Sequence, residues 1–206
     1  DQAFNANTDN TNLSGQITVA YKGSERVNAY ATFSTNYKPV GLNLGGLPTS
    51  NGEPMLELAE IKPEHVKHYE VGIKTTPSEN STLNLAVYNT DIKDFQTQVQ
   101  TAEVGVNRGY LANAEKVRVR GAELDGNLFI GHILSLYGAL SYTDGKYISF
   151  KNAPVPLEET GAESAFKDVS GGKLPGISKW AGSLGGQIDL PSKFLTLGGN
   201  YFLALD

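Results

Sequence analysis

The sequence lacks several features that would assign it to a common class of protein. It has no cysteine, which excludes disulfide bridges and thiolate metal sites. It has no run of about 18 apolar residues, so no transmembrane helix is expected. Its 17 basic residues are outnumbered by 22 acidic ones, for a net charge of -5, whereas nucleic-acid-binding domains carry basic patches. We therefore expect no nucleic-acid partner.

Motifs of enzymes and cofactor sites are also missing. The sequence has no phosphate loop, nucleotide fingerprint or Ser/His/Asp set. His65 and His68 are separated by an odd number of residues, so on a strand they would point to opposite faces and could not share a metal ion. We expect no catalytic activity, no cofactor and no metal site.

What the sequence does contain is alternation of apolar and polar residues from end to end, which predicts β-strands. The expected strands lie near residues 16–22, 27–37, 69–74, 83–88, 116–128, 134–143, 180–190 and 195–205. Most span roughly 9 to 13 residues, the length that a tilted strand needs to cross a bilayer. Strands of ordinary globular domains are shorter, at about 5 or 6 residues.

The segments between these strands alternate between short and long. Short turns are expected at residues 22–25, 76–81, 129–132 and 191–193, and long polar segments at 38–63, 91–115 and 144–177. Outer-membrane barrels have this rhythm, with short periplasmic turns and long extracellular loops. The sequence thus predicts an all-β fold, an antiparallel up-and-down transmembrane β-barrel.

A secreted or surface β-sandwich that binds glycans or proteins is the alternative, because it explains the alternation equally well. The two folds differ in what the apolar positions contact. A barrel leaves them exposed on its outside, and a sandwich buries them between two sheets. The positions that distinguish the folds are Val71, Leu85, Leu136 and Leu197.

The alternation changes phase at Gly121, which predicts a β-bulge there. Such a bulge would place Arg118 and Arg120 on the same polar face as Glu123 and Asp125. The charges expected to face the lumen of the barrel are Glu70, Lys74, Arg118, Arg120, Glu123 and Asp125. Arg118 and Arg120 would either brace the lumen through ion pairs with Glu70 and Glu123 or attract an anionic chelate.

If the short turns are periplasmic, both ends of the chain are extracellular. That is the wrong side for a complete bacterial barrel, so we expect residues 1–206 to be part of a larger one. A complete eight-stranded barrel with an adhesive or structural role is the competing hypothesis.

Four segments, in this order, resemble the TonB-dependent receptors of Gram-negative outer membranes. They are "IKPEHVKHYEVGIKTT" (61–76), "LNLAVYNTDIKDFQTQV" (83–99), "NRGYLANAEKVRVRGAELD" (107–125) and "DVSGGKLPGISKWAGSLG" (168–185). The resemblance covers roughly residues 55 to 205. Ile177 and Ser178 depart from it, because the family often has Ala-Pro at this place.

The resemblance implies about eight strands from the later half of a 22-stranded barrel in the outer membrane, closed by a plug domain that this chain does not contain. It implies import of a scarce nutrient, such as a ferric siderophore or similar iron chelate, with energy from the TonB complex. Implied partners are membrane lipid, the plug, the TonB complex and the iron chelate. From their place in a long loop, Arg108 and Tyr110 are candidates for contact with the ligand.

Overall fold

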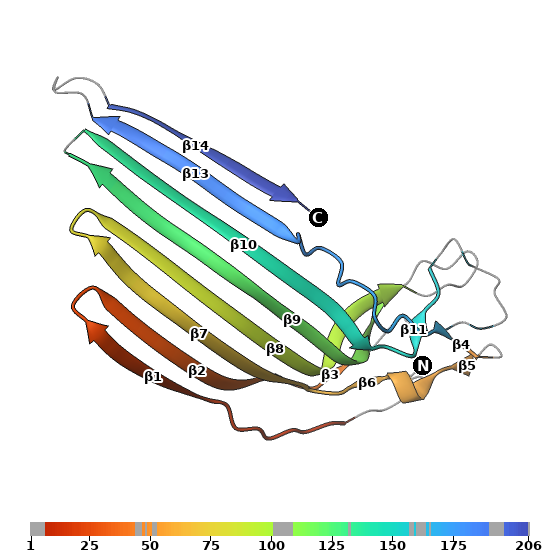
Figure 1. Ribbon diagram of the computed structural model, residues 1–206. Helices are drawn as coiled ribbons and strands as arrows, with labels where there is room; N and C mark the ends of the chain where they lie inside the picture. Colours follow the sequence, from red (N-terminus) through yellow and green to blue (C-terminus); the bar gives the residue numbers. More distant parts are fainter. Residues whose placement is uncertain are drawn as a thin grey trace.

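The computed structural model describes residues 7–43, 47, 49–50, 53–100, 109–131, 133–156, 159, 164, 166–189 and 196–205. Eight antiparallel strands form one sheet in chain order (Figure 1). They are β1 (Gly15–Ser24), β2 (Val27–Lys38), β7 (Glu64–Ser78), β8 (Ser81–Gln100), β9 (Gly109–Ile130), β10 (Leu134–Ser149), β13 (Trp180–Asp189) and β14 (Thr196–Leu205). Within the described residues β1 and β14 do not pair with each other, so the sheet is open, as predicted for part of a barrel.

Smaller elements lie at the end of the sheet opposite the tight turns (Figure 1). They are three two-residue strand pairs and a short 3-10 helix. Their bounds are β3 (Gly41–Leu42) with β6 (Glu60–Ile61), β4 (Thr49–Ser50) with β5 (Glu53–Pro54), β11 (Ala153–Pro154) with β12 (Phe166–Lys167), and η1 (Leu56–Leu58). In the part of the chain described, no helix is long and apolar enough to span a membrane.

The two faces of the sheet differ sharply in polarity. Apolar side chains that alternate along the strands stay exposed on one face, including Val71 at 58%, Leu85 at 42% and Leu136 at 38%. No second sheet covers them in the described residues, so the β-sandwich alternative is wrong. The side chain of Leu197 lies outside the described residues.

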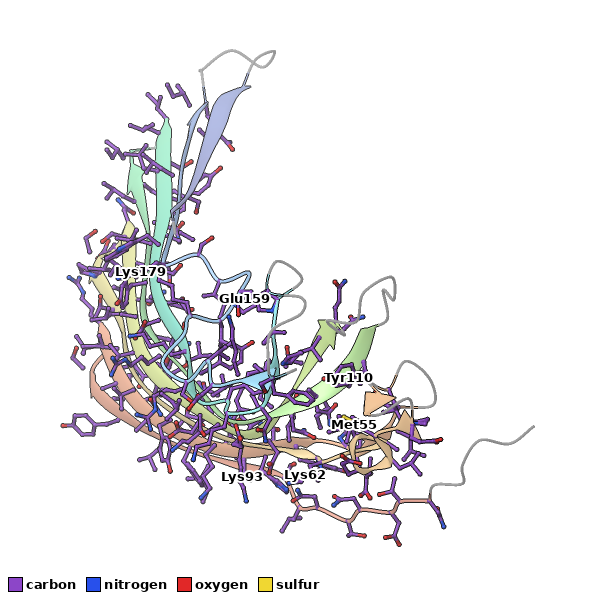
Figure 2. The ribbon with its side chains drawn as sticks, turned by 90° about the vertical axis from the view of Figure 1, so that its right-hand side faces the viewer. Met55, Lys62, Lys93, Tyr110, Glu159 and Lys179 are labelled. Carbon is purple, nitrogen blue, oxygen red and sulfur yellow. The ribbon has the colours of Figure 1, made fainter. Side chains whose placement is uncertain are left out.

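The buried core lies at the loop end of the sheet and not along its length. Its buried members are Ala114, Val117, Tyr147, Phe150, Ala153 and Leu174. Segments after β10 fold back against the sheet, and Figure 2 shows them on its concave side together with Tyr110 and Glu159. We refer to this side as the concave face and to the exposed apolar side as the convex face.

Several strands are longer than predicted, β8 and β9 most of all. Residues 91–115 were expected to form a polar loop, but β8 and β9 remain paired as far as Gln100 and Gly109. Ile92, Phe95 and Val99 pack against the core, and this burial stabilises both strands toward their loop ends.

The bulge predicted at Gly121 is wrong. The register of β9 is continuous with both β8 and β10 through this residue. A Cβ atom built on Gly121 would overlap the backbone carbonyl oxygen of Tyr142 and lie 2.7 Å from Tyr88 Oη, so the glycine leaves room for the neighbouring strand and for the ring of Tyr88. Gly72 does the same for Tyr30, whose ring atoms lie 2.5 Å from the position of a Cβ. Both glycines are explained by a close approach and not by a backbone irregularity.

Candidate functional site

The concave face carries a band of polar side chains across β2, β7, β8 and β9. Tyr30 donates a hydrogen bond from Oη to Glu70 Oε1 at 2.7 Å, and His68 Nε2 lies 3.6 Å from the other oxygen of the same carboxylate. Lys74 Nζ lies 5.5 Å from the centroid of the Tyr30 ring. These contacts join two neighbouring strands and hold Glu70 in a fixed position.

The same band continues onto β8 and β9. Asn84 donates a hydrogen bond from Nδ2 to Asp125 at 2.9 Å. Glu123 lies across from Ala86 on one side and Ser141 on the other. Because register places Lys74 opposite Asn84, the predicted residues Glu70, Lys74, Glu123 and Asp125 share the concave face. That this face lines a lumen stays a prediction.

Arg118 and Arg120 lie on the opposite face, so the prediction that they share a face with Glu70 and Glu123 is wrong. The continuous register puts them in line with Ala122 and Leu124. Arg118 Nε contacts Asp91 at 2.7 Å, and Arg120 Nη2 lies 3.3 Å from Asp144. On this face of β9 the apolar side chains are therefore followed by charged ones. In the sequence, this change looks like a shift in the alternation of apolar and polar residues, although the strand is regular.

The Arg118–Asp91 pair lies above the apolar part of the convex face. The hydrogen bond from Arg118 lowers the pKa of the Asp91 carboxyl, and partial burial opposes this shift without cancelling it. The same contact raises the pKa of the Arg118 guanidinium. The pair is therefore charged at neutral pH.

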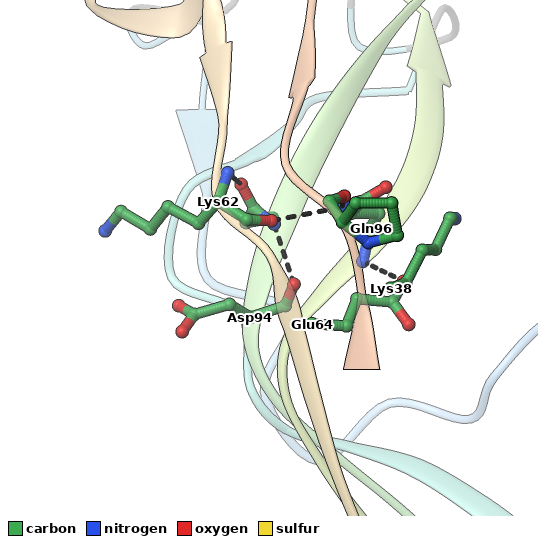
Figure 3. Close-up of polar contacts among 7 residues, drawn as sticks. Lys38, Lys62, Glu64, Asp94 and Gln96 are labelled. Carbon is green, nitrogen blue, oxygen red and sulfur yellow. Dashed lines mark hydrogen bonds and ion pairs between the residues drawn. The ribbon is translucent and has the colours of Figure 1, made fainter. Parts of the chain in front are cut away.

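Gln96 anchors the long segment between β2 and β7 onto β8 (Figure 3). Its side-chain Nε2 donates hydrogen bonds to the carbonyl oxygens of Pro39 at 2.8 Å and Lys62 at 3.1 Å. Its backbone N–H donates to Glu64 Oε1 at 2.7 Å, and Lys38 Nζ lies 3.6 Å from the same oxygen. Both ends of the segment are thus tied to one residue.

Asn113 and Asn43 complete this anchorage. Asn113 Nδ2 donates to the carbonyl oxygens of Lys62 and Asp94, and its Oδ1 accepts a hydrogen bond from the Lys62 backbone N–H. Asn43 Nδ2 donates a hydrogen bond to the carbonyl oxygen of Leu111 at 2.8 Å, and its Oδ1 accepts one from the Leu111 backbone N–H at 3.0 Å. Sequence analysis missed these anchors, because their partners are distant in the chain and no local motif marks them.

Tyr110 is only 4% exposed. Burial raises the pKa of its phenol to about 12, so it is neutral at physiological pH. Arg108 lies outside the described residues. A role of either residue in ligand contact stays a prediction.

The described residues contain no group of three or more His, Cys, Asp or Glu side chains that could hold a metal ion. His68 contacts Thr90 and Glu70 on the concave face. His65 points to the other face, where its neighbours across the strands are Tyr37 of β2 and Lys93 of β8. The two histidines therefore point away from each other.

Comparison with known proteins gives consistent matches. The family described as "TonB dependent receptor-like, beta-barrel" matches residues 1–204. A protein of Acinetobacter baumannii, the probable TonB-dependent siderophore receptor PiuA, is 25% identical over 185 residues, which cover 88% of this chain and 23% of the relative.

Solved structures share the fold at lower sequence identity. The ferric yersiniabactin uptake receptor FyuA from Yersinia pestis has a TM-score of 0.63 and 19% identity, over 90% of this chain and 24% of that one. The copper transporter OprC has a TM-score of 0.68 and 14% identity, over 93% of this chain and 26% of that one. The chain thus spans about a quarter of the length of the relatives it matches.

Proposed function

The chain belongs to the TonB-dependent receptor-like β-barrel family, and from this membership we propose that it is part of a receptor that imports a scarce nutrient. Members of the family are proteins of the Gram-negative outer membrane, so this is the location of the chain. They are receptors and transporters and not enzymes. The family match over residues 1–204 is the observation that carries the proposal.

In the proposed protein, residues 1–206 form part of the later half of a larger barrel. A plug domain elsewhere in the full-length protein fills the lumen, and the TonB complex supplies the energy for transport. Support comes from the open sheet, whose eight strands follow chain order, and from relatives about four times as long.

In this proposal the concave face lines the passage. Its polar band, with Glu70, Lys74, Glu123 and Asp125, suits a hydrated lumen and contact with a plug. The anchored segments near Tyr110 form part of the outer mouth, where the ligand is captured, and Tyr110 and Arg108 are the candidate residues for ligand contact. The hydrogen bonds of Gln96 and Asn43 hold that mouth in one shape before the ligand arrives.

The proposed cargo is a ferric siderophore or a similar iron chelate. Support comes from two similar proteins, the probable siderophore receptor PiuA and the ferric yersiniabactin uptake receptor FyuA. Copper is the second candidate, because the structure of OprC, a copper transporter, also shares the fold.

The test is uptake by intact cells that carry or lack the gene. Cells grown under iron limitation receive radioactive iron as ferric complexes of a catecholate, a hydroxamate or a carboxylate siderophore. We expect deletion to abolish uptake of at least one complex, and loss of the TonB complex to have the same effect. If all three complexes enter normally and copper uptake falls instead, the cargo is copper. If neither changes, the import proposal is wrong.

A further inference from the structure

The outer part of β8 and β9 extends beyond the neighbouring strands. Pairing of β7 with β8 ends at His65 and Lys93, and pairing of β10 with β9 ends at Ser149 and Lys116. Beyond these points β8 and β9 pair only with each other among the described strands. We call this part, residues 94–100 with 109–115, the outer hairpin. A two-stranded hairpin is marginally stable by itself, so this one depends on what covers its two faces.

One face of the outer hairpin is apolar and packs against the chain that follows β10. We call the described residues between β10 and β13 the second loop segment. They supply Phe150, Ala153 and Leu174 to the buried core, and β11 of this segment lies against β8. The side chains of the hairpin in or against this core are Phe95, Val99, Ala112 and Ala114. Burial of these apolar groups holds the second loop segment on the hairpin.

The other face of the outer hairpin carries amide side chains. They bind the described residues between β2 and β7, which we call the first loop segment. Gln96 and Asn113 pair across the hairpin, and both side chains donate a hydrogen bond to the Lys62 carbonyl oxygen (Figure 3). Because neighbouring residues of a strand point to opposite faces, this face lies opposite to that of Phe95 and Ala114. The hairpin is thus held between the two loop segments.

The strand turns at Asp94, where the outer hairpin begins. Ile92 and Phe95 both pack against the same core, although their odd separation would place them on opposite faces of a regular strand. Asp94 lies between them with a φ of 55°, the left-handed conformation that aspartate adopts more readily than most residues. Asn113 Nδ2 donates a hydrogen bond to the Asp94 carbonyl oxygen at 2.7 Å. Asn113 therefore holds both this turn and the first loop segment.

We propose that the outer hairpin and the two loop segments open only together, as one cooperative unit, with Asn113 as a central contact between them. Loss of either segment would uncover one face of a hairpin that no other described strand supports, so the hairpin and the other segment would loosen as well. Because such coupling is reciprocal, a partner that contacts one segment stabilises the other across the hairpin. The coupling is a property of the free protein, so it does not depend on the proposed import function.

The test is hydrogen–deuterium exchange of the full-length protein in non-ionic detergent, measured by mass spectrometry of its peptides. The Asn43 amide reports on the first loop segment, because it donates to the Ala59 carbonyl oxygen at 2.8 Å. The Val169 amide reports on the second, because it donates to the Phe150 carbonyl oxygen at 2.9 Å. We expect Asn113→Ala to speed exchange of both amides about tenfold, since it removes hydrogen bonds that close the unit. Exchange in β1 should stay unchanged.

The reciprocal variant is Phe150→Leu, which weakens the core on the other side of the hairpin. We expect it to speed exchange of the same two amides by a common factor of up to about ten. The matched control is Asn127→Ala, which removes a side-chain hydrogen bond to Thr82 from the same strand as Asn113, near the tight turns. We expect it to leave both amides unchanged.

Two results would overturn the proposal. One is a rise confined to the loop segment on the substituted side, because the hairpin would then hold each segment independently. The other is an equal rise in β1, because the opening would then involve the whole sheet. Asn113→Ala and Phe150→Leu act on opposite faces of the hairpin, so if one variant fails to fold, the other still tests the coupling.

Discussion

Replacing one lipid-facing leucine by arginine tests the assignment of the two faces. Leu140 is 48% exposed on the convex face of β10. The apolar positions on this face run from Leu134 to Tyr142, with Gly138 in the middle. At about 3.3 Å per residue and a tilt of about 45°, Leu140 lies about 5 Å from the middle of the apolar band.

The expected effect is large at this depth. Arginine on the lipid face of a barrel costs about 2–4 kcal/mol at the bilayer midplane and little near the interface. For Leu140→Arg we therefore expect a loss of about 2–3 kcal/mol in the free energy of unfolding. The matched control is Ala139→Arg on the opposite face, where Asp125 is the cross-strand neighbour and the expected change is within about 0.5 kcal/mol.

The assay is urea unfolding of the full-length protein in phospholipid vesicles, followed by tryptophan fluorescence. Leu140→Ala separates lost packing from the cost of the charge. Equal losses for arginine at positions 139 and 140 would refute the assignment of faces. A larger loss at 139 would reverse it.

Three further predictions concern single contacts. Gly121→Ala should lower the free energy of unfolding by about 1–3 kcal/mol, because the new methyl group overlaps the ring of Tyr88 and the carbonyl oxygen of Tyr142, and a double-mutant cycle with Tyr88→Ala should recover only the part of the loss that the ring causes. Asn43→Ala should leave backbone groups near Leu111 without partners, and hydrogen–deuterium exchange there should rise while exchange in β1 stays unchanged. The stabilising contribution of ionised Asp91, whose pKa is lowered, is complete above the ordinary aspartate pKa of about 4 and is lost as the pH falls below it. The unfolding temperature of Asp91→Asn should therefore depend less on pH in that range than that of the unmodified protein.

Alternation in the sequence predicted the strands well because a period of two residues is a local property of a half-exposed sheet. The predicted strand at 134–143 corresponds to β10, and 180–190 corresponds to β13. The chemistry of a face, by contrast, is not local. Arg118 lies on the same face of β9 as Leu124. Beyond the bilayer the side chains on that face change from apolar to charged, and in the sequence this looks like a shift of the apolar positions to the other face.

Long-range anchors could not be predicted for a different reason. Asn43 and Leu111 are 68 residues apart, and an asparagine in a polar segment is usual in any loop. The alternation changes at Gly121, but a glycine at such a place has two physical explanations, a β-bulge or a close approach of neighbouring atoms. The continuous register of β9 with β8 and β10, together with the close approach of Tyr88 and Tyr142, decides against a bulge.

Because the strands differ in length, they end at different heights at the loop end of the sheet. β8 has 20 residues and β13 has 10, a difference of about 33 Å along the strand direction. The part of β8 that extends beyond β13 carries Phe95 and Val99, which pack against the core, and Gln96, which holds the segment between β2 and β7. A substitution there that leaves membrane insertion intact would therefore still loosen the loops that this hairpin supports.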